Sequence, residues 1–201
     1  FCVQTNIFPL HSFYAAAAIC MNDNSPEILY LKERYASARN KYKPREIGVL
    51  LLAEGPPDSL DRHFYFEDVK KQDSLFLEIM GVLYPEQKKQ YLASGRETEL
   101  KQELLSSYQE DGYFLLDLSD VPCSLLEEGM AAQLPLLLKL LPRLIDKQTP
   151  VILIKASVYD LCYVPLTESG YRVHLERMPF PGSGQQRVFR ESSARQSHYT
   201  N

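Results

Sequence analysis

The sequence predicts an α/β fold: a three-layer αβα sandwich with a central, mainly parallel four-stranded sheet and extra N-terminal helices. Two observations lead to this prediction. Short, continuously apolar runs recur along the chain, and such runs are typical of strands that are buried on both faces of a parallel sheet. Stretches with helical spacing separate the runs, and this alternation of strand and helix indicates that helices cover both faces of the sheet.

Four segments are expected to form the strands. Three are the apolar runs, which turn-forming residues bound: Gly48–Ala53, Tyr113–Leu118 and Val151–Lys155. The fourth, Tyr171–Glu176, is a weaker candidate, and it alternates between apolar and polar residues as an edge strand does.

The spacing of apolar residues predicts six helices, two ahead of the first strand and four between the strands: Ser12–Met21, Pro26–Ala38, Ser74–Tyr84, Glu97–Tyr108, Leu125–Ile145 and Ala156–Ser169. Pro135 and Pro142 are expected to kink or divide the long leucine-rich segment, because proline removes a helical hydrogen bond. Gly170 is expected to cap the last helix.

The composition indicates a single domain over residues 1–201, with an N-terminal helical extension (1–45) and a polar tail (190–201). A chain of 201 residues with 45 % hydrophobic residues can fill one sizeable core. The net charge of −4 argues against non-specific coating of nucleic acid but allows a local basic face. Between residues 172 and 195, five arginines accompany only two acidic residues.

The sequence gives no sign of a cofactor, a metal site or a membrane partner. The four cysteines are scattered, no C-x-x-C pair occurs and no histidine lies at zinc spacing, so neither zinc nor an iron–sulfur cluster is expected. The longest early apolar stretch, Phe13–Met21, has about half the length of a membrane helix and lacks a basic leader. Sparse cysteines suit reduced thiols, so we expect a cytoplasmic protein.

In parallel sheets ligands bind outside the carboxyl ends of the strands, which makes three loops candidates for the site: Glu54–Phe66, Ser119–Cys123 and Arg177–Gly184. The chain lacks G-x-G-x-x-G, G-x-x-x-x-G-K-[ST] and G-x-S-x-G, which argues against dehydrogenases, P-loop enzymes and ordinary esterases.

The first loop combines two carboxylates, Glu54 and Asp58, with a stiff Gly-Pro-Pro turn and an aromatic cluster that includes Phe64 and Tyr65. One interpretation is a rigid loop that presents an acid or base beside a stacking platform. The other is a turn that caps a helix, with aromatics that fill the core. Asp117, near the end of the second apolar run, also allows two interpretations. It either belongs to a site or caps the next helix.

The third loop joins two prolines, which stiffen the backbone, to Gly182 and Gly184, which allow close approach to a ligand. Ser183 or Gly184 is a candidate start for a final helix that faces an anion. Arg177 and Arg187 add positive charge, and the alternative is a solvated surface helix.

Over about Ile47 to Phe189, these loops together resemble the uracil-DNA glycosylase superfamily. The family's Pro-containing loop after its first strand is similar to Ala53-Glu54-Gly55-Pro56-Pro57. The aromatic that stacks on the flipped base corresponds to Phe64, Tyr65 or Phe66, and the uracil-reading Asn corresponds to Asp117. The family's DNA-gripping His-Pro-Ser loop corresponds to Met178-Pro179-Phe180-Pro181-Gly182-Ser183.

The resemblance implies a protein that binds a nucleobase, free or within DNA, and hydrolyses its N-glycosidic bond. It implies Glu54 or Asp58 as the catalytic carboxylate, and substrate contacts from Gly55, Pro56, Phe64, Tyr65 and Asp117. It implies nucleic-acid contacts from Arg177, Pro179, Phe180, Gly182, Ser183 and Arg187.

Three departures from the family's pattern bear on the chemistry. Met178 stands in the place of the catalytic His and offers no comparable donor. Asp117 replaces the amide that pairs with uracil, and a carboxylate prefers a donor-rich edge such as an amino group or a purine N–H. The cysteines of the iron–sulfur branch are missing. The alternatives are therefore a non-catalytic nucleotide-binding, DNA-binding or regulatory module on the same fold, and a small-molecule hydrolase or transferase.

Overall fold

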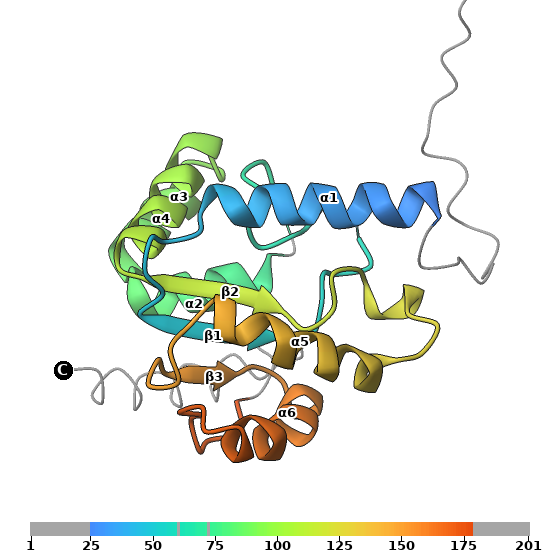
Figure 1. The fold of residues 1–201 in the computed structure, drawn as a ribbon. Coiled ribbons are helices and arrows are strands. Elements are labelled where there is room, and N and C mark those ends of the chain that lie inside the picture. Colours follow the sequence, from blue (N-terminus) through green and yellow to red (C-terminus); the bar gives the residue numbers. More distant parts are fainter. Residues whose placement is uncertain (1–24, 60, 72, 179–201) are drawn as a thin grey trace, which may run out of the picture.

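The computed structural model describes residues 25–59, 61–71 and 73–178, which form a mixed α/β fold (Figure 1). Six α-helices and three strands follow one another within these residues: α1 (Pro26–Lys41), β1 (Val49–Ala53), α2 (Ser74–Leu83), α3 (Pro85–Ala93), α4 (Thr98–Glu110), β2 (Tyr113–Asp117), α5 (Leu134–Leu140), β3 (Val151–Leu153) and α6 (Ala156–Glu168). The predicted helix Ser12–Met21 and the predicted tail 190–201 lie outside the described residues.

The sheet is parallel throughout, and β1 is its central strand, in the order β2-β1-β3. All five residues of β1 are buried, which explains why this strand is an unbroken apolar run in the sequence. The register pairs Ala53 with Asp117 and Leu52 with Leu153. All three strands therefore end at the same edge of the sheet, and the loops that follow them meet there.

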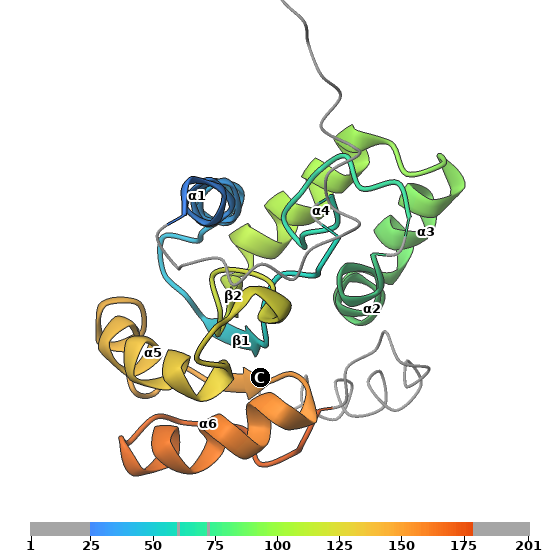
Figure 2. The same cartoon turned by 90° about the vertical axis from the view of Figure 1, so that its right-hand side faces the viewer.

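The helices surround this sheet in two groups. Figure 2 shows α2, α3 and α4 together on one side of the strands, and α5 with α6 on another. Helix α4 packs against β2, and α6 packs against β3. A second, smaller hydrophobic cluster lies under α1, where residues of that helix meet the loop after β1 and the segment after β2: Ile28, Leu31, Tyr35, Phe66, Val69 and Val121. Helix α1 thus covers the long loop that leads to the candidate site. None of the helices in the described residues is both long and apolar enough to cross a membrane.

The prediction of a four-stranded sheet is wrong, because the segment Tyr171–Glu176 does not form a continuous strand. It makes one isolated parallel bridge to the edge of the sheet, from Val173 to Val151, and a second bridge follows just beyond it, from Met178 to Ile154. Five residue steps from Val173 to Met178 face three steps from Val151 to Ile154, so the backbone bows outward between the bridges. The Glu176 amide donates to His174 Nδ1 at 3.1 Å and stabilises this bow.

The predicted helix Leu125–Ile145 is divided, as its prolines indicate. It contains the 3-10 turns Met130–Gln133 and Leu141–Arg143 together with α5, and a further 3-10 turn, Cys123–Leu125, ends where the predicted helix begins. Pro135 and Pro142 each lie in the first turn of one of these segments, where proline is tolerated. Helix α3 was not predicted, because only one of its nine residues, Tyr91, is buried and its sequence has no apolar period.

Candidate functional site

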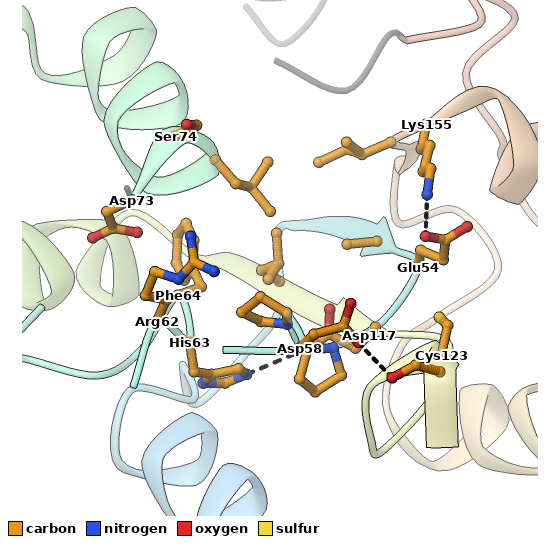
Figure 3. Close-up of a pocket in the computed structure, with 18 residues that line it drawn as sticks. Glu54, Asp58, Arg62, His63, Phe64, Asp73, Ser74, Asp117, Cys123 and Lys155 are labelled. Carbon is orange, nitrogen blue, oxygen red and sulfur yellow. Dashed lines mark hydrogen bonds and ion pairs between the residues drawn. The ribbon is translucent and has the colours of Figure 1, made fainter. Parts of the chain in front are cut away.

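A cavity of about 570 Å³ lies at the edge of the sheet where the strands end (Figure 3). Its polar and charged lining comes from the loop after β1, the start of α2, the end of β2, the 3-10 turn Cys123–Leu125 and Lys155, the second residue after β3. Apolar side chains from four different segments complete the walls: Phe64, Leu75, Leu115 and Ile154. The shared register of the three strands brings these distant parts of the chain together.

Six of the residues singled out in the sequence line this cavity: Glu54, Gly55, Pro56, Asp58, Phe64 and Asp117. Arg177 is exposed and forms an ion pair with Asp160 of α6. The remaining residues of the third loop lie outside the described residues: Pro179, Phe180, Gly182, Ser183 and Arg187.

Tyr65, predicted to contact the substrate, is not among the lining residues and lies in the hydrophobic core. Its hydroxyl donates to the Leu115 carbonyl at 3.1 Å and accepts from the Leu115 amide at 2.8 Å. These are the two backbone groups that a further strand beside β2 would use. Tyr65 therefore terminates the sheet at that edge, which is a structural role.

Gly55 is required by the close approach of two loops. A Cβ atom at this position would lie 3.2 Å from Cys123 Sγ, 3.2 Å from the Val121 carbonyl oxygen and 3.3 Å from Ser119 Cβ. The Ser119 amide donates to the Glu54 carbonyl at 3.1 Å and holds the two loops together. Glycine thus lets the loops after β1 and β2 pack tightly, and their packing fixes the cavity wall.

Glu54, the first residue after β1, is held by groups from beyond β3. Its carboxylate forms an ion pair with Lys155 and accepts a hydrogen bond from Ser157 Oγ at 2.8 Å. Lys155 has a φ of 84° and a ψ of 140°, a backbone conformation that glycine adopts readily and that costs another residue about 1–3 kcal/mol. The surrounding structure therefore holds Lys155 against its backbone preference, and the pairing neutralises the charge of Glu54.

Asp117, the last residue of β2, pairs with His63 from the loop after β1. The distance from Asp117 Oδ2 to His63 Nε2 is 3.3 Å, and the two side chains are only 6 % and 2 % exposed. Figure 3 shows the His63 ring directed toward Asp117. Three aromatic rings surround His63, with centroids 4.9 Å away for Tyr35, 5.2 Å for Phe66 and 5.8 Å for Tyr65. This packing fixes the orientation of the imidazole.

Asp58 is the exposed member of the four carboxylates that line the cavity. Ser124 Oγ, from the 3-10 turn after β2, donates to its Oδ1 at 2.5 Å. This bond orients the carboxylate while leaving it accessible to water and to a ligand. Among the cavity carboxylates, Asp58 is therefore best placed to act on a bound molecule.

Asp73, just before α2, is a buried carboxylate in the cavity wall. It accepts a hydrogen bond from Lys101 Nζ of α4 at 2.6 Å, and the Lys101 side chain is fully buried. Burial raises the pKa of Asp73 and lowers the pKa of Lys101, while the attraction between the two groups opposes both shifts. The pair anchors one wall of the cavity to α4.

Cys123 also lines the cavity, but it is not an activated nucleophile. Burial raises the pKa of its thiol to about 11, and the neighbouring Glu54 carboxylate adds to the shift. The thiol is therefore protonated at neutral pH and unreactive. In the part of the chain that the structure describes, no three His, Cys, Asp or Glu side chains are grouped so that they could hold a metal ion.

Comparisons of the chain with protein-family models, with curated proteins and with solved structures find no match.

The sequence identified the carboxylates after β1 and β2 but not the groups that pair with them. Lys155 had one signal, since it is a charged residue at the carboxyl end of a buried apolar run. Lys101 had another, because it lies on the buried face of α4 beside Leu104 and Leu105. His63 stood within the aromatic cluster, but nothing in that cluster indicated its partner.

Proposed function

We propose that this chain is a divergent member of the uracil-DNA glycosylase superfamily, a three-layer αβα sandwich that binds a nucleobase, free or within DNA, and hydrolyses its N-glycosidic bond. The observation that carries the proposal is that Glu54, Asp58, Phe64 and Asp117 line one cavity at the ends of parallel strands. Phe64 and the aliphatic walls suit a flat ring, and the carboxylates suit a reaction that develops positive charge on a sugar.

In the proposed reaction water adds to C1′ of the sugar while the bond from C1′ to the base nitrogen breaks. The base leaves with the electron pair of that bond and takes up one proton from solvent, the sugar keeps the hydroxyl, and the proton that the attacking water gives up returns to solvent. Asp58 accepts the proton of the attacking water and stabilises the cationic sugar, because its carboxylate is exposed and is held by Ser124. Glu54 contributes less, since Lys155 and Ser157 already occupy its oxygens.

The test is a product assay against oligonucleotides that carry a panel of normal and modified bases. We expect the wild-type protein to release free base, detected by liquid chromatography with mass spectrometry, and Asp58→Asn to lower the rate by about 100-fold or more. Glu54→Gln is expected to have the smaller effect.

Asp61→Asn is the matched control. Asp61 is an exposed carboxylate of the same loop that is not among the cavity-lining residues, so its loss should leave the rate unchanged. Failure of the wild-type protein to release any base from the panel would contradict the hydrolase proposal.

One observation favours a second candidate, a non-catalytic binding module on the same fold. Met178 stands in the place of the family's catalytic His, is 1 % exposed and packs in the core. Binding of a nucleoside without release of base from any oligonucleotide would support this alternative.

A further inference from the structure

Lys155 occupies a position where the local backbone disfavours lysine. Its φ of 84° and ψ of 140° define a conformation that glycine adopts readily and that other residues adopt only at a cost. Lys155 is also the N-cap of α6, where serine, threonine, aspartate and asparagine are preferred and a positive charge is unfavourable. A residue that breaks two local preferences at the edge of a cavity indicates a role for its side chain there.

The backbone on both sides fixes the direction of the Lys155 side chain. Its amide donates to the Met178 carbonyl at 2.9 Å, and its carbonyl accepts from the Tyr159 amide in the first turn of α6 at 3.1 Å. Figure 3 shows the side chain extending from the end of β3 toward Glu54. The Lys155 side chain is 42 % exposed, so its amine is accessible to a molecule that enters the cavity.

Lys155 carries the only amine among the cavity-lining residues that the structure describes. The carboxylate of Glu54 pairs with this amine, and Ser157 Oγ donates to the other carboxylate oxygen at 2.8 Å. Glu54 can therefore take up the proton that an ammonium must lose before its nitrogen attacks a carbonyl carbon. It can then return that proton to the oxygen that leaves as water.

The proposed hydrolysis produces a reaction partner for this amine. Release of the base leaves a hydroxyl on C1′, and the sugar ring of such an abasic site opens to an aldehyde at that carbon. We propose that Lys155 forms an imine with C1′ of an abasic site in DNA, and that the protein then cleaves the strand by β-elimination. This inference rests on the DNA form of the proposed function and adds a second activity to the same cavity.

The steps of this reaction balance with water alone. The nitrogen of Lys155 attacks the C1′ aldehyde, and loss of one water gives a protonated imine. Glu54 removes a proton from C2′, and the electron pair of that C–H bond forms a double bond between C2′ and C3′. The bond from C3′ to the phosphate oxygen breaks, and the phosphate leaves with its electron pair. Water then hydrolyses the imine, which frees Lys155 and an unsaturated aldehyde, and the proton on Glu54 returns to solvent.

The experiment supplies an oligonucleotide that already contains one abasic site, so it does not depend on base release by this protein. Sodium cyanoborohydride reduces the imine to a stable amine, and peptide mass spectrometry locates the covalent adduct. For the wild-type protein we expect an adduct on Lys155 and, without the reductant, cleavage of the strand on the 3′ side of the abasic site. Lys155→Arg keeps the positive charge but removes the amine, so the adduct and the cleavage should both be lost.

Lys139→Arg is the matched control, because Lys139 is exposed on α5 and is not among the lining residues. It should leave the adduct and the cleavage unchanged. Lys155→Gly separates the chemistry from the fold, since glycine adopts this backbone conformation without strain. This variant should have a thermal midpoint no lower than that of the wild type and still form no adduct. Glu54→Gln removes the proton acceptor and should slow strand cleavage by about 100-fold or more.

The outcomes separate this inference from the proposed hydrolysis. An adduct only on other lysines, an adduct that persists in Lys155→Arg, or no adduct at all would overturn the inference. Base release without an adduct would leave the hydrolase proposal intact and contradict the imine alone. An adduct on Lys155 without base release from any oligonucleotide would support the inference and contradict the hydrolase proposal.

Discussion

Lys101 is fully buried, and its amine lies over the Phe76 ring, 4.3 Å from the centroid, while it pairs with Asp73. Such a pair contributes little compared with two apolar residues, but loss of one partner leaves the other as an uncompensated charge in an apolar environment. The wall of the cavity therefore depends on both residues being present.

We expect Lys101→Met to lower the free energy of unfolding by about 3–5 kcal/mol, measured by urea denaturation. The double variant Lys101→Met with Asp73→Asn should recover part of this loss, because it removes the orphaned charge. Lys89→Met, which breaks an exposed ion pair with Glu86 on α3, should change stability by no more than about 0.5 kcal/mol. Equal effects of Lys101→Met and Lys89→Met would contradict this account of the buried pair.

Residues of the site could be predicted from the sequence where their position at the end of a buried apolar run was enough to locate them in the fold. Glu54 and Asp117 end buried runs, and the ends of parallel strands meet at one edge. Their partners could not be predicted, because pairing depends on the folded path: 101 residues separate Lys155 from Glu54, and 54 separate His63 from Asp117. Tyr65 shows the same limit, since its contact with Leu115 spans 50 residues.

Among the secondary-structure elements, Glu67 joins α1 to α4. Its carboxylate pairs with Lys41 at the end of α1 and accepts hydrogen bonds from Tyr42 at 2.6 Å and Gln102 at 2.5 Å. Burial works to raise the pKa of Glu67, but the three partners together outweigh it and lower the pKa to about 2. Because the folded-state pKa is depressed, the stabilisation is present above the ordinary value near 4.5 and is lost as pH falls toward 2.

Glu67→Gln should therefore destabilise the protein by about 1–2 kcal/mol at pH 7 and by progressively less as the pH falls from about 4.5 toward 2. The difference in thermal midpoint between variant and wild type, followed across this pH range, measures the effect. Glu86→Gln, at an exposed pair, is the comparison and should show little effect at either end. A Glu67→Gln deficit that stays constant over the whole range would rule out the linkage.

Element boundaries followed the sequence closely wherever periodicity, proline or glycine marks them, as at β1 and at α6, which ends just before Gly170 with its φ of 84°. The expected strand at Tyr171–Glu176 does not form, and the reason lies in its pairing with the neighbouring strand. Alternation of apolar and polar residues fits an extended edge, but it does not encode the number of residues that face the neighbouring strand. That count is set by the fold.

At the scale of the whole molecule, an acidic chain carries five of its eleven arginines between residues 172 and 195. If this segment holds DNA phosphates, the protein should bind single-stranded DNA with an affinity that falls steeply with salt. Arg177→Ala with Arg187→Ala should weaken binding and flatten the plot of log affinity against log salt by about 1–2 units, measured by fluorescence anisotropy.

Arg143→Ala serves as the matched control, because Arg143 is exposed and lies outside this segment. It should leave both the affinity and its dependence on salt unchanged. Binding that is insensitive to salt, or no binding at low salt, would contradict a phosphate-holding role for the arginines.

Neither edge of the sheet is free to pair with a further strand along its whole length. On one side the Tyr65 hydroxyl bonds both Leu115 backbone groups, and on the other the bowed backbone between Val173 and Met178 pairs only at its ends. Neither border presents a straight ladder that a neighbouring molecule could extend. A chain without the Tyr65 hydroxyl would leave a hydrophobic strand with unmet backbone groups, and such a strand invites fibril growth between copies. The Tyr65 hydroxyl thus leaves neither backbone group of Leu115 free for a strand of another copy.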